Sequence, residues 1–212
     1  MKFAESMLRL YAVTDRSWLG EQTLYEQVEL ALRGGATCVQ LREKELDRDG
    51  FYREAKELKT LCARYGVPLI INDNVALAME VDADGVHVGQ EDMDAQDVRG
   101  LIGPGKILGV TAKTIEQARK AQQAGADYLG SGAVFGSATK ANAKPMTMEL
   151  LKSICESVTI PVVAIGGIHR GNIATLAGTG IRGAAVVSGI FAATDIEEEC
   201  RVLRAEVEKL VK

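Results

Sequence analysis

The feature that most constrains the fold of this chain is the regular alternation of short β-rich runs with helical patterns from one end to the other. Eight apolar runs of strand length are present, and 212 residues shared among eight units give about 26 residues each. That length suits one strand followed by one helix, and parallel strands need such a helical crossover between them. The predicted strands are residues 10–14, 38–42, 68–72, 85–89, 107–111, 128–132, 161–165 and 184–188.

Segments whose apolar residues recur every three or four positions follow these runs, as expected for amphipathic helices. In the last segment, Ile196, Cys200, Leu203 and Val207 lie on one helical face. A glycine and then small or acidic residues precede several of the strands, which is a common way for a helix to end before a turn. The predicted helices are residues 23–33, 47–65, 74–80, 94–102, 114–124, 147–158, 172–178 and 195–211.

Eight strand–helix units favour a closed (β/α)8 TIM barrel, a fold that needs about 200 residues or more. An open, doubly wound parallel sheet is the alternative. Against the open sheet, no G-x-G-x-x-G motif follows the first predicted strand. No linker or shift of composition divides the chain, so we expect a single barrel domain over residues 1–212.

The composition and the net charge argue against some classes of binding partner. Hydrophobic residues make up 47% of the chain and charged residues 25%, as in soluble globular proteins. The formal net charge is −4, whereas nucleic-acid-binding domains usually carry a basic excess. No run approaches the roughly 18 apolar residues of a membrane helix, and the first residues lack the apolar core of a signal peptide. The four cysteines form no C-x-x-C pair. We expect a reduced, cytoplasmic protein with no nucleic-acid or membrane partner.

The stretch VQLREK gathers polar side chains on one face of a predicted strand. Apolar and polar residues alternate along it, which is the period of an extended chain. If its valine and leucine pack against helices, then Gln40, Arg42 and Lys44 share the opposite, inner face. An amide, a guanidinium and an ammonium facing inward indicate a binding function.

Further charged residues follow the other predicted strands, where the reactive groups of TIM barrels lie. Arg42, Lys44 and Lys140 are cations of this rim, and Asp73 and Asp92 are its carboxylates. Without a ligand these charges would largely cancel one another. A polyanion bound through Mg²⁺ reconciles them, because carboxylate and phosphate oxygens share the metal while Arg and Lys take the remaining oxygens. Mg²⁺ needs only one or two protein carboxylates.

Each rim residue also has an ordinary structural explanation. Asp73 or Asn74 could cap the helix that follows the third strand, which is the usual task of such a residue. Asp92 also has an ordinary explanation, because other acids near it can cap the fourth helix and Asp94 is the expected cap. His87 could be a hydrogen-bonded core histidine, and Lys140 a solvated loop lysine.

Glycines at the ends of the last two strands imply a second anion site. Gly166 and Gly167 follow the seventh predicted strand, and Ser188 and Gly189 lie at the end of the eighth. Many barrels bind a phosphate here on backbone N–H groups and the start of a short helix. Glycine permits the close approach because it has no Cβ. A metal-bound diphosphate on one side and a monophosphate on the other suggest two phosphorylated small-molecule substrates, and hence a transferase.

The motifs LYAVTD, VQLREK, INDN, ADGVHVGQED, LGVTAKT, ATK, AIGGI and VVSGIF resemble, in that order, those of the thiamine-phosphate synthase family, over residues 10–191. The resemblance implies a TIM-barrel transferase that uses Mg²⁺. Its implied reaction joins 4-amino-2-methyl-5-hydroxymethylpyrimidine diphosphate to 4-methyl-5-(2-phosphoethyl)thiazole, giving thiamine phosphate and diphosphate.

The resemblance also implies roles for individual positions. The residues implied to hold the pyrimidine diphosphate are Gln40, Arg42, Lys44, Asn72, Thr111 and Lys140. Those implied to hold the thiazole phosphate are Ser137, Thr139, Gly167, Val187 and Ser188. Asp73 and Asp92 are implied to ligate Mg²⁺. His87 and Gly89 are implied to contact the pyrimidine ring.

Three positions depart from the family pattern. Family members often have Ser in place of Thr111, His in place of Lys113 and Pro in place of Gly136. A hydroxyl is kept at Thr111, whereas Gly136 adds backbone freedom that is lost when the loop closes. Two alternatives stay open: a related barrel that isomerises the thiazole phosphate, and a non-catalytic barrel that binds thiamine phosphate. The sequence does not fix the oligomeric state, and a homodimer is only a guess.

Overall fold

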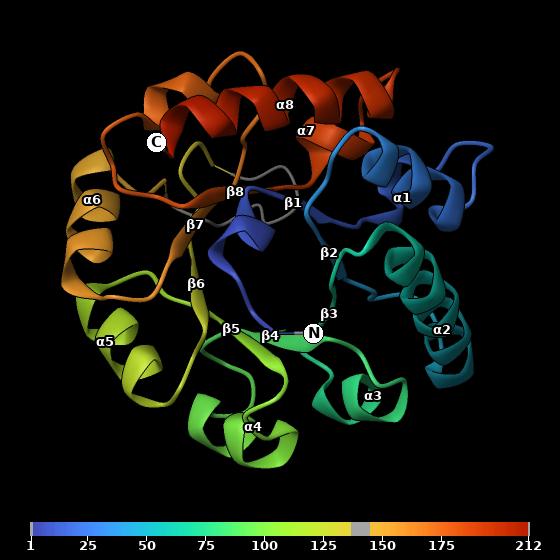
Figure 1. The fold of residues 1–212 in the computed structure, drawn as a ribbon, viewed down its shortest axis with the longest axis horizontal. Helices are drawn as coiled ribbons and strands as arrows, with labels where there is room; N and C mark the ends of the chain where they lie inside the picture. The colour runs from blue at the N-terminus through green and yellow to red at the C-terminus, as the bar shows by residue number, and fades with distance from the viewer. Residues whose placement is uncertain (1, 137–144, 212) are drawn as a thin grey trace.

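The fold is a closed barrel of parallel strands surrounded by helices (Figure 1). The computed structural model describes residues 2–136 and 145–211. Each strand pairs with the next, and β8 pairs with β1 to close the sheet. The strands are β1 (Leu10–Val13), β2 (Cys38–Leu41), β3 (Leu69–Asn72), β4 (Gly85–Val88), β5 (Ile107–Thr111), β6 (Tyr128–Gly132), β7 (Val162–Ile165) and β8 (Gly183–Val186). The predicted TIM barrel is confirmed, and the open sheet is excluded.

Helices cover the outside of the barrel (Figure 1). The α-helices are α1 (Leu24–Arg33), α2 (Arg48–Tyr65), α3 (Val75–Glu80), α4 (Ala95–Ile102), α5 (Ile115–Gln123), α6 (Met148–Ser157), α7 (Ser188–Phe191) and α8 (Ile196–Leu210). The short 3₁₀ helices are η1 (Glu5–Leu8), η2 (Arg16–Trp18) and η3 (Ile173–Leu176). Within residues 2–136 and 145–211, none of the helices combines the length and the apolar character that a membrane span requires.

Two predictions of local structure are wrong. The segment 172–178 forms only the short helix η3, because the chain turns soon afterwards at Gly178, whose φ is 78°. The strand predicted over residues 184–188 ends at Val186. Val187, at φ −109° and ψ −91°, leaves the extended region, and Ser188 already begins α7.

Local sequence signals fix where the long helices begin and end. At α1, the Thr23 side chain accepts the backbone N–H of Glu26 and the Glu26 carboxylate accepts that of Thr23, which completes a capping box. At α2, the Asp47 carboxylate accepts the N–H of Gly50, and Gly66 ends the helix in the left-handed region at φ 67°. These caps determine which residues are left for the loops between strands and helices.

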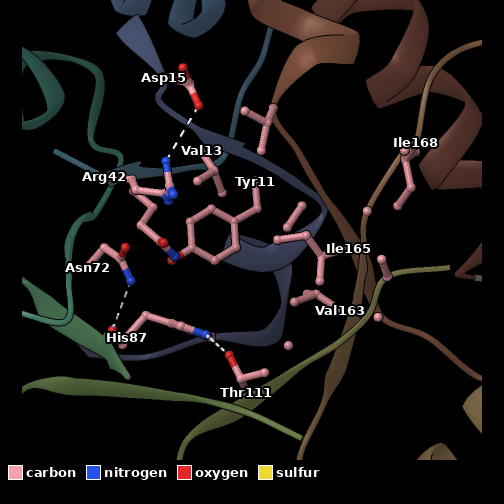
Figure 2. Close-up of a pocket in the computed structure, with 18 of the residues that line it drawn as sticks. Tyr11, Val13, Asp15, Arg42, Asn72, His87, Thr111, Val163, Ile165 and Ile168 are labelled. Atoms are coloured by element: carbon pink, nitrogen blue, oxygen red, sulfur yellow. Dashed lines mark hydrogen bonds and ion pairs between the residues drawn. The ribbon is translucent and has the colours of Figure 1, made fainter. Parts of the chain in front are cut away.

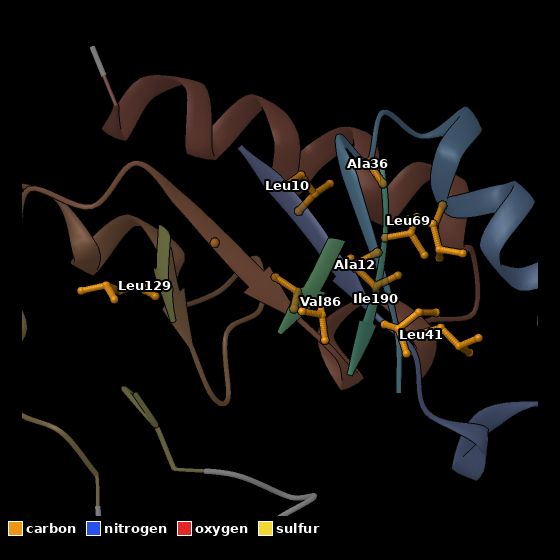
Figure 3. Packing of buried hydrophobic residues seen from close by; sticks show 14 of the residues in the cluster. Leu10, Ala12, Ala36, Leu41, Leu69, Val86, Leu129 and Ile190 are labelled. Atoms are coloured by element: carbon orange, nitrogen blue, oxygen red, sulfur yellow. The ribbon is translucent and has the colours of Figure 1, made fainter. Parts of the chain in front are cut away.

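The larger apolar core lies between the barrel and its helices (Figure 3). Strand residues that point outward, such as Leu41, Val86 and Leu129, are fully buried in it. Burial of one such side chain contributes about 1.5–3 kcal/mol. This core explains why Val39 and Leu41 of VQLREK are apolar, and it confirms that their neighbour Gln40 faces the barrel interior.

A second core fills the barrel itself from the end where the strands begin. Leu8 of η1 lies there with the inward side chains Cys38, Ile70 and Ile107. The N-terminal segment runs across the centre of the barrel in Figure 1. Its Phe3 ring stacks on a buried tyrosine, Tyr128, with the ring centroids 6.4 Å apart. Apolar side chains therefore fill the barrel where the strands begin, and the inward-facing polar side chains lie where the strands end.

Candidate active site

An open cavity lies where the strands end (Figure 2). Every strand contributes to its wall, because the carboxyl ends of parallel strands meet at one end of a closed barrel. The strand residues that line it are Tyr11, Val13, Gln40, Asn72, His87, Thr111, Gly130, Gly132, Val163, Ile165 and Ala185.

A chain of hydrogen bonds crosses the floor of this cavity. The Gln40 Nε2 atom donates to the Tyr11 hydroxyl at 2.8 Å, and the Tyr11 hydroxyl lies 2.8 Å from that of Tyr128. The Tyr128 hydroxyl is 3.0 Å from His87 Nδ1, and His87 Nε2 is 3.0 Å from the Thr111 hydroxyl. Five side chains from β1, β2, β4, β5 and β6 are therefore connected. His87 is buried and hydrogen-bonded, as expected for a core histidine, and it also lines the cavity.

Two glycines make room for the rings of this chain. A Cβ at Gly109 would collide with the Tyr128 hydroxyl and with His87 Nδ1. A Cβ at Gly130 would lie 3.1 Å from the His87 ring. Both tyrosines are buried, and burial raises the pKa of Tyr11 and of Tyr128 well above the ordinary value. Both hydroxyls therefore keep their protons near neutral pH.

Arg42 brings positive charge to the cavity wall, and its side chain is 25% exposed. The guanidinium lies 3.5 Å from a carboxylate oxygen of Asp15, which follows β1 (Figure 2). The other Asp15 oxygen accepts the backbone N–H and the hydroxyl of Ser17, at 2.9 and 2.6 Å. Asp15 is thus held in place by η2 and in turn steers Arg42. Sequence reasoning missed Asp15, although its place at the end of the first strand was a usable signal.

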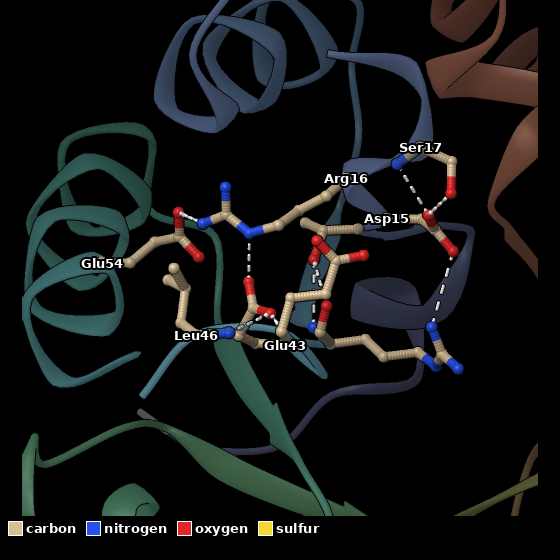
Figure 4. A network of polar contacts seen from close by, with 9 residues as sticks. Asp15, Arg16, Ser17, Glu43, Leu46 and Glu54 are labelled. Atoms are coloured by element: carbon tan, nitrogen blue, oxygen red, sulfur yellow. Dashed lines mark hydrogen bonds and ion pairs between the residues drawn. The ribbon is translucent and has the colours of Figure 1, made fainter. Parts of the chain in front are cut away.

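Glu43, the acid of VQLREK, anchors the loop behind Arg42 (Figure 4). It is buried, and its carboxylate accepts the backbone N–H groups of Glu45 and Leu46 and binds Arg16. Arg16 also binds Glu54 of α2, so the loops after β1 and β2 are tied to one helix. Burial alone would raise the pKa of Glu43, but the Glu45 N–H and the Arg16 guanidinium outweigh it and hold that pKa below the ordinary value.

Lys44 does not reach the inner face that alternation predicted for it. The strand β2 ends at Leu41, so the alternating pattern stops before this residue. Lys44 is exposed at the rim, where its Nζ lies 2.7 Å from a carboxylate oxygen of Asp73. The other Asp73 oxygen accepts from the Asn72 amide at 2.6 Å. Asn74, rather than Asp73, caps α3 by accepting the N–H of Leu77.

Asp92 lies on the neighbouring rim loop, after β4. Its carboxylate accepts the backbone N–H of Gly89 at 2.7 Å, and a Cβ at Gly89 would lie 2.9 Å from the same oxygen. Asp94 caps α4 instead. Asp73 and Asp92 thus follow adjacent paired strands, and neither is used as a helix cap. Within the described ranges, no cluster of three or more His, Cys, Asp or Glu residues could hold a metal, so the predicted pair of aspartates stays a prediction.

The opposite wall of the cavity presents the backbone of glycines rather than charged side chains. Gly166 and Gly167 adopt φ values of 105° and 64°, which favour glycine. A Cβ at Gly167 would lie 2.9 Å from the Phe135 carbonyl oxygen, and one at Gly166 would collide with Ala133. Ser188 begins the short helix α7 beside these glycines and lines the same cavity. The first N–H groups of a helix have no acceptor within it, so this wall offers donors to an anion.

The structure brings most of the predicted residues together and leaves others at the rim. Those that line the cavity are Gln40, Arg42, Asn72, His87, Thr111, Gly167, Val187 and Ser188. Those at the rim, outside the lining, are Lys44, Asp73, Gly89 and Asp92. Those that lie outside the described residues are Ser137, Thr139 and Lys140. Lining residues that sequence reasoning had not singled out include Tyr11, Asp15, Ile165 and Ile168.

Comparison with known proteins gives consistent results. Residues 10–190 match the family model described as thiamine monophosphate synthase. A thiamine-phosphate synthase of Ruminiclostridium cellulolyticum is 50% identical over 194 residues, covering 92% of each chain. One of Clostridium botulinum is 48% identical over 201 residues, covering 95% of this chain and 94% of that protein. The solved structure of a thiamine phosphate pyrophosphorylase from Pyrococcus furiosus superposes with a TM-score of 0.90 at 38% identity, covering 98% of this chain and 99% of that one.

Proposed function

The chain belongs to the thiamine monophosphate synthase family, and we propose that it joins 4-amino-2-methyl-5-hydroxymethylpyrimidine diphosphate to 4-methyl-5-(2-phosphoethyl)thiazole. The products are thiamine phosphate and diphosphate. The observation that carries the proposal is a single cavity with two unlike walls. Arg42 supplies charge on the wall from β2, and Gly167 and Ser188 supply backbone donors on the wall from β7 and β8. Two anionic substrates that meet over one floor suit this arrangement.

The hard step of the proposed reaction is departure of the diphosphate. The bond between the pyrimidine methylene carbon and the diphosphate oxygen breaks, and its electron pair leaves with that oxygen. The electron-rich aminopyrimidine stabilises the methylene cation. Arg42 offsets the negative charge as it develops on the leaving group, and the Asn72 amide and the Thr111 hydroxyl line the same cavity. Lys44 and Lys140 are the further cations that we assign to this group.

The second step forms the new carbon–nitrogen bond. The lone pair of the thiazole nitrogen forms a bond to the methylene carbon, which lost its earlier bonding pair with the diphosphate. Holding the thiazole by its phosphate turns a search between two molecules into a step within one complex. We assign this phosphate to Gly167, Val187 and Ser188, together with Ser137 and Thr139. We assign the pyrimidine ring to His87 on the floor and to Gly89 at the rim.

We assign Asp73 and Asp92 to a magnesium ion. The residues fit this cation because Asp73 already holds a positive charge, the Lys44 ammonium, at 2.7 Å. Both aspartates also follow adjacent strands and cap no helix. One or two carboxylates are enough for Mg²⁺, whose other ligands are phosphate oxygens and water. When bound, the ion would supply positive charge to the oxygens of the diphosphate. Lys44 would then be released to bind a phosphate oxygen itself.

The test mixes the protein with both substrates and Mg²⁺ and measures released diphosphate and thiamine phosphate together. We expect both products in equal amounts, none when either substrate is left out, and loss of turnover when a chelator removes the metal. A thiazole phosphate isomerase or a non-catalytic thiamine phosphate-binding barrel would release no diphosphate. Absence of diphosphate release with both substrates present would overturn the proposal.

A further inference from the structure

The hydrogen-bond chain on the cavity floor has a direction. It runs from Gln40 through Tyr11, Tyr128 and His87 to Thr111, with successive distances of 2.8, 2.8, 3.0 and 3.0 Å. The amide nitrogen of Gln40 can only donate. A tyrosine hydroxyl has one proton to donate. The donor at the first position therefore favours one direction for the later bonds, in which each hydroxyl accepts from one neighbour and donates to the next.

The protons can be placed one bond at a time. The Tyr11 oxygen accepts from Gln40, and we assign its single proton to the Tyr128 oxygen, the oxygen acceptor that lies 2.8 Å away. The Tyr128 proton is then given to His87 Nδ1, which must accept it without a proton of its own. A neutral imidazole that accepts at Nδ1 carries its proton on Nε2, and here Nε2 faces the Thr111 hydroxyl.

We propose that Gln40, Tyr11 and Tyr128 act as positioning residues that fix His87 as the neutral tautomer protonated on Nε2, so that Thr111 turns its hydroxyl proton into the cavity. The proposal deepens the function proposed above and rests on it for the nature of the acceptor. Because the Thr111 oxygen accepts from His87, its proton is left for an anionic oxygen of the bound diphosphate group. A hydroxyl that both accepts and donates in a chain is a stronger donor than an isolated one.

The surroundings hold the chain in this direction. Tyr11 and Tyr128 are 1% and 0% exposed, and their rings pack edge to face with centroids 5.8 Å apart. Burial also keeps both hydroxyls protonated, because it raises the pKa of each. A phenolate at either position would accept from both neighbours and break the direction. Gly109 and Gly130 leave the space in which the His87 ring meets Tyr128.

The decisive measurement is the ¹⁵N NMR spectrum of histidine-labelled protein at neutral pH, without substrates. The chain has only two histidines, so His169→Asn identifies the His87 signals. We expect Nε2 to be protonated and Nδ1 to be an unprotonated acceptor. Tyr128→Phe keeps the ring but removes the donor to Nδ1, and we expect it to yield a mixture of tautomers or the one protonated on Nδ1. Tyr52→Phe, the same change on α2 away from the cavity lining, should leave the His87 spectrum unchanged.

Three results would overturn the proposal. A wild-type His87 protonated on Nδ1 would mean that Gln40 presents its oxygen to Tyr11. A doubly protonated ring would mean that His87 donates to Tyr128. An unchanged tautomer in Tyr128→Phe would mean that the chain does not control the ring. The wild-type spectrum decides the first two points even if the variant fails to fold.

A kinetic comparison tests the consequence at Thr111. Thr111→Ser keeps a hydroxyl, so we expect it to retain a clearly higher kcat for diphosphate release than Thr111→Val, which has none. Thr111→Val keeps the shape but has no proton to donate, and a lost hydrogen bond to a charged group corresponds to a fall of about 10- to 100-fold. Equal rates for the two variants would overturn the donor role of Thr111. If the NMR result holds while no variant or wild type releases diphosphate, the proposed function is wrong and the tautomer assignment stands.

Discussion

The two walls of the cavity present unlike chemical groups. On the side of β1 to β4 these groups are charged side chains, and they already have partners: Arg42 is paired with Asp15, and Lys44 with Asp73. On the side of β6 to β8, the chain presents glycines in conformations that other residues rarely adopt. Side-chain ion pairs can exchange partners when a ligand arrives, whereas a backbone wall has its shape before the ligand binds. The charged wall is thus adjustable and the glycine wall is preformed.

The largest effect is expected at the cation that lines the charged wall. Arg42→Gln removes the guanidinium but keeps a polar side chain. We expect kcat/KM for diphosphate release to fall about 100- to 1000-fold, the usual loss when one donor to a developing negative charge is removed. Initial rates measure it. Arg48→Gln, on the exposed side of α2, is the matched control and should stay within about 2-fold. Equal losses in both variants would show that net charge, and not this position, matters.

The rim carboxylate on the charged wall should act through the metal. For Asp92→Asn we expect the Mg²⁺ concentration that gives half-maximal rate to rise about 10- to 100-fold, with activity partly restored by excess metal. Titration of the rate with Mg²⁺ measures the shift. Asp97→Asn, an exposed change on α4, is the control. A variant that keeps wild-type turnover and an unchanged metal requirement would remove Asp92 from the metal site.

The anchor behind the charged wall should affect stability more than chemistry. Glu43→Gln loses the charge that binds Arg16 and the two loop N–H groups, and we expect the free energy of unfolding to fall by about 1.5–3 kcal/mol at pH 7. Because the folded-state pKa of Glu43 is lowered, its contribution is present above the unfolded-state pKa and is lost as pH falls through the folded-state value.

Urea unfolding at pH 7 and in acid tests this prediction. The difference between wild type and Glu43→Gln should shrink as the solution is acidified. Glu57→Gln, exposed on the same helix as Glu54, is the matched control and should show little difference at either pH. A difference that grows in acid would contradict the assigned role of the Glu43 charge.

The smallest effect is expected on the preformed wall. Gly167→Ala places a Cβ 2.9 Å from the Phe135 carbonyl at a φ of 64°, which costs about 1–2 kcal/mol in the left-handed region. We expect KM for the thiazole phosphate to rise about 10-fold, with a smaller change in the KM for the pyrimidine diphosphate. Gly105→Ala, where the φ is ordinary and the Cβ meets open space, is the control. Equal changes in both KM values would mean that the two walls do not divide the substrates.

The sequence alone predicted the fold and the family, because local residue patterns indicate both. Apolar runs repeated with helical segments between them require parallel strands, and the caps Thr23 and Asp47 set the helix boundaries. Alternation along VQLREK correctly turned Gln40 inward, and glycine pairs after the late strands marked the backbone wall. Since parallel strands all finish at one end of a barrel, convergence of the strand-end residues followed from topology.

Only the tertiary structure decided how those residues contact one another. Lys44 lies in the loop beyond the end of β2 at Leu41, where the strand alternation no longer holds, and it pairs with Asp73 at the rim. Glu43 looked like part of the binding motif but is a buried anchor for Arg16. The chain through Tyr11, Tyr128 and His87 joins three strands that are distant in sequence. Side-chain partners across a closed barrel depend on strand register and on the space left by glycines such as Gly109, and no local pattern records either.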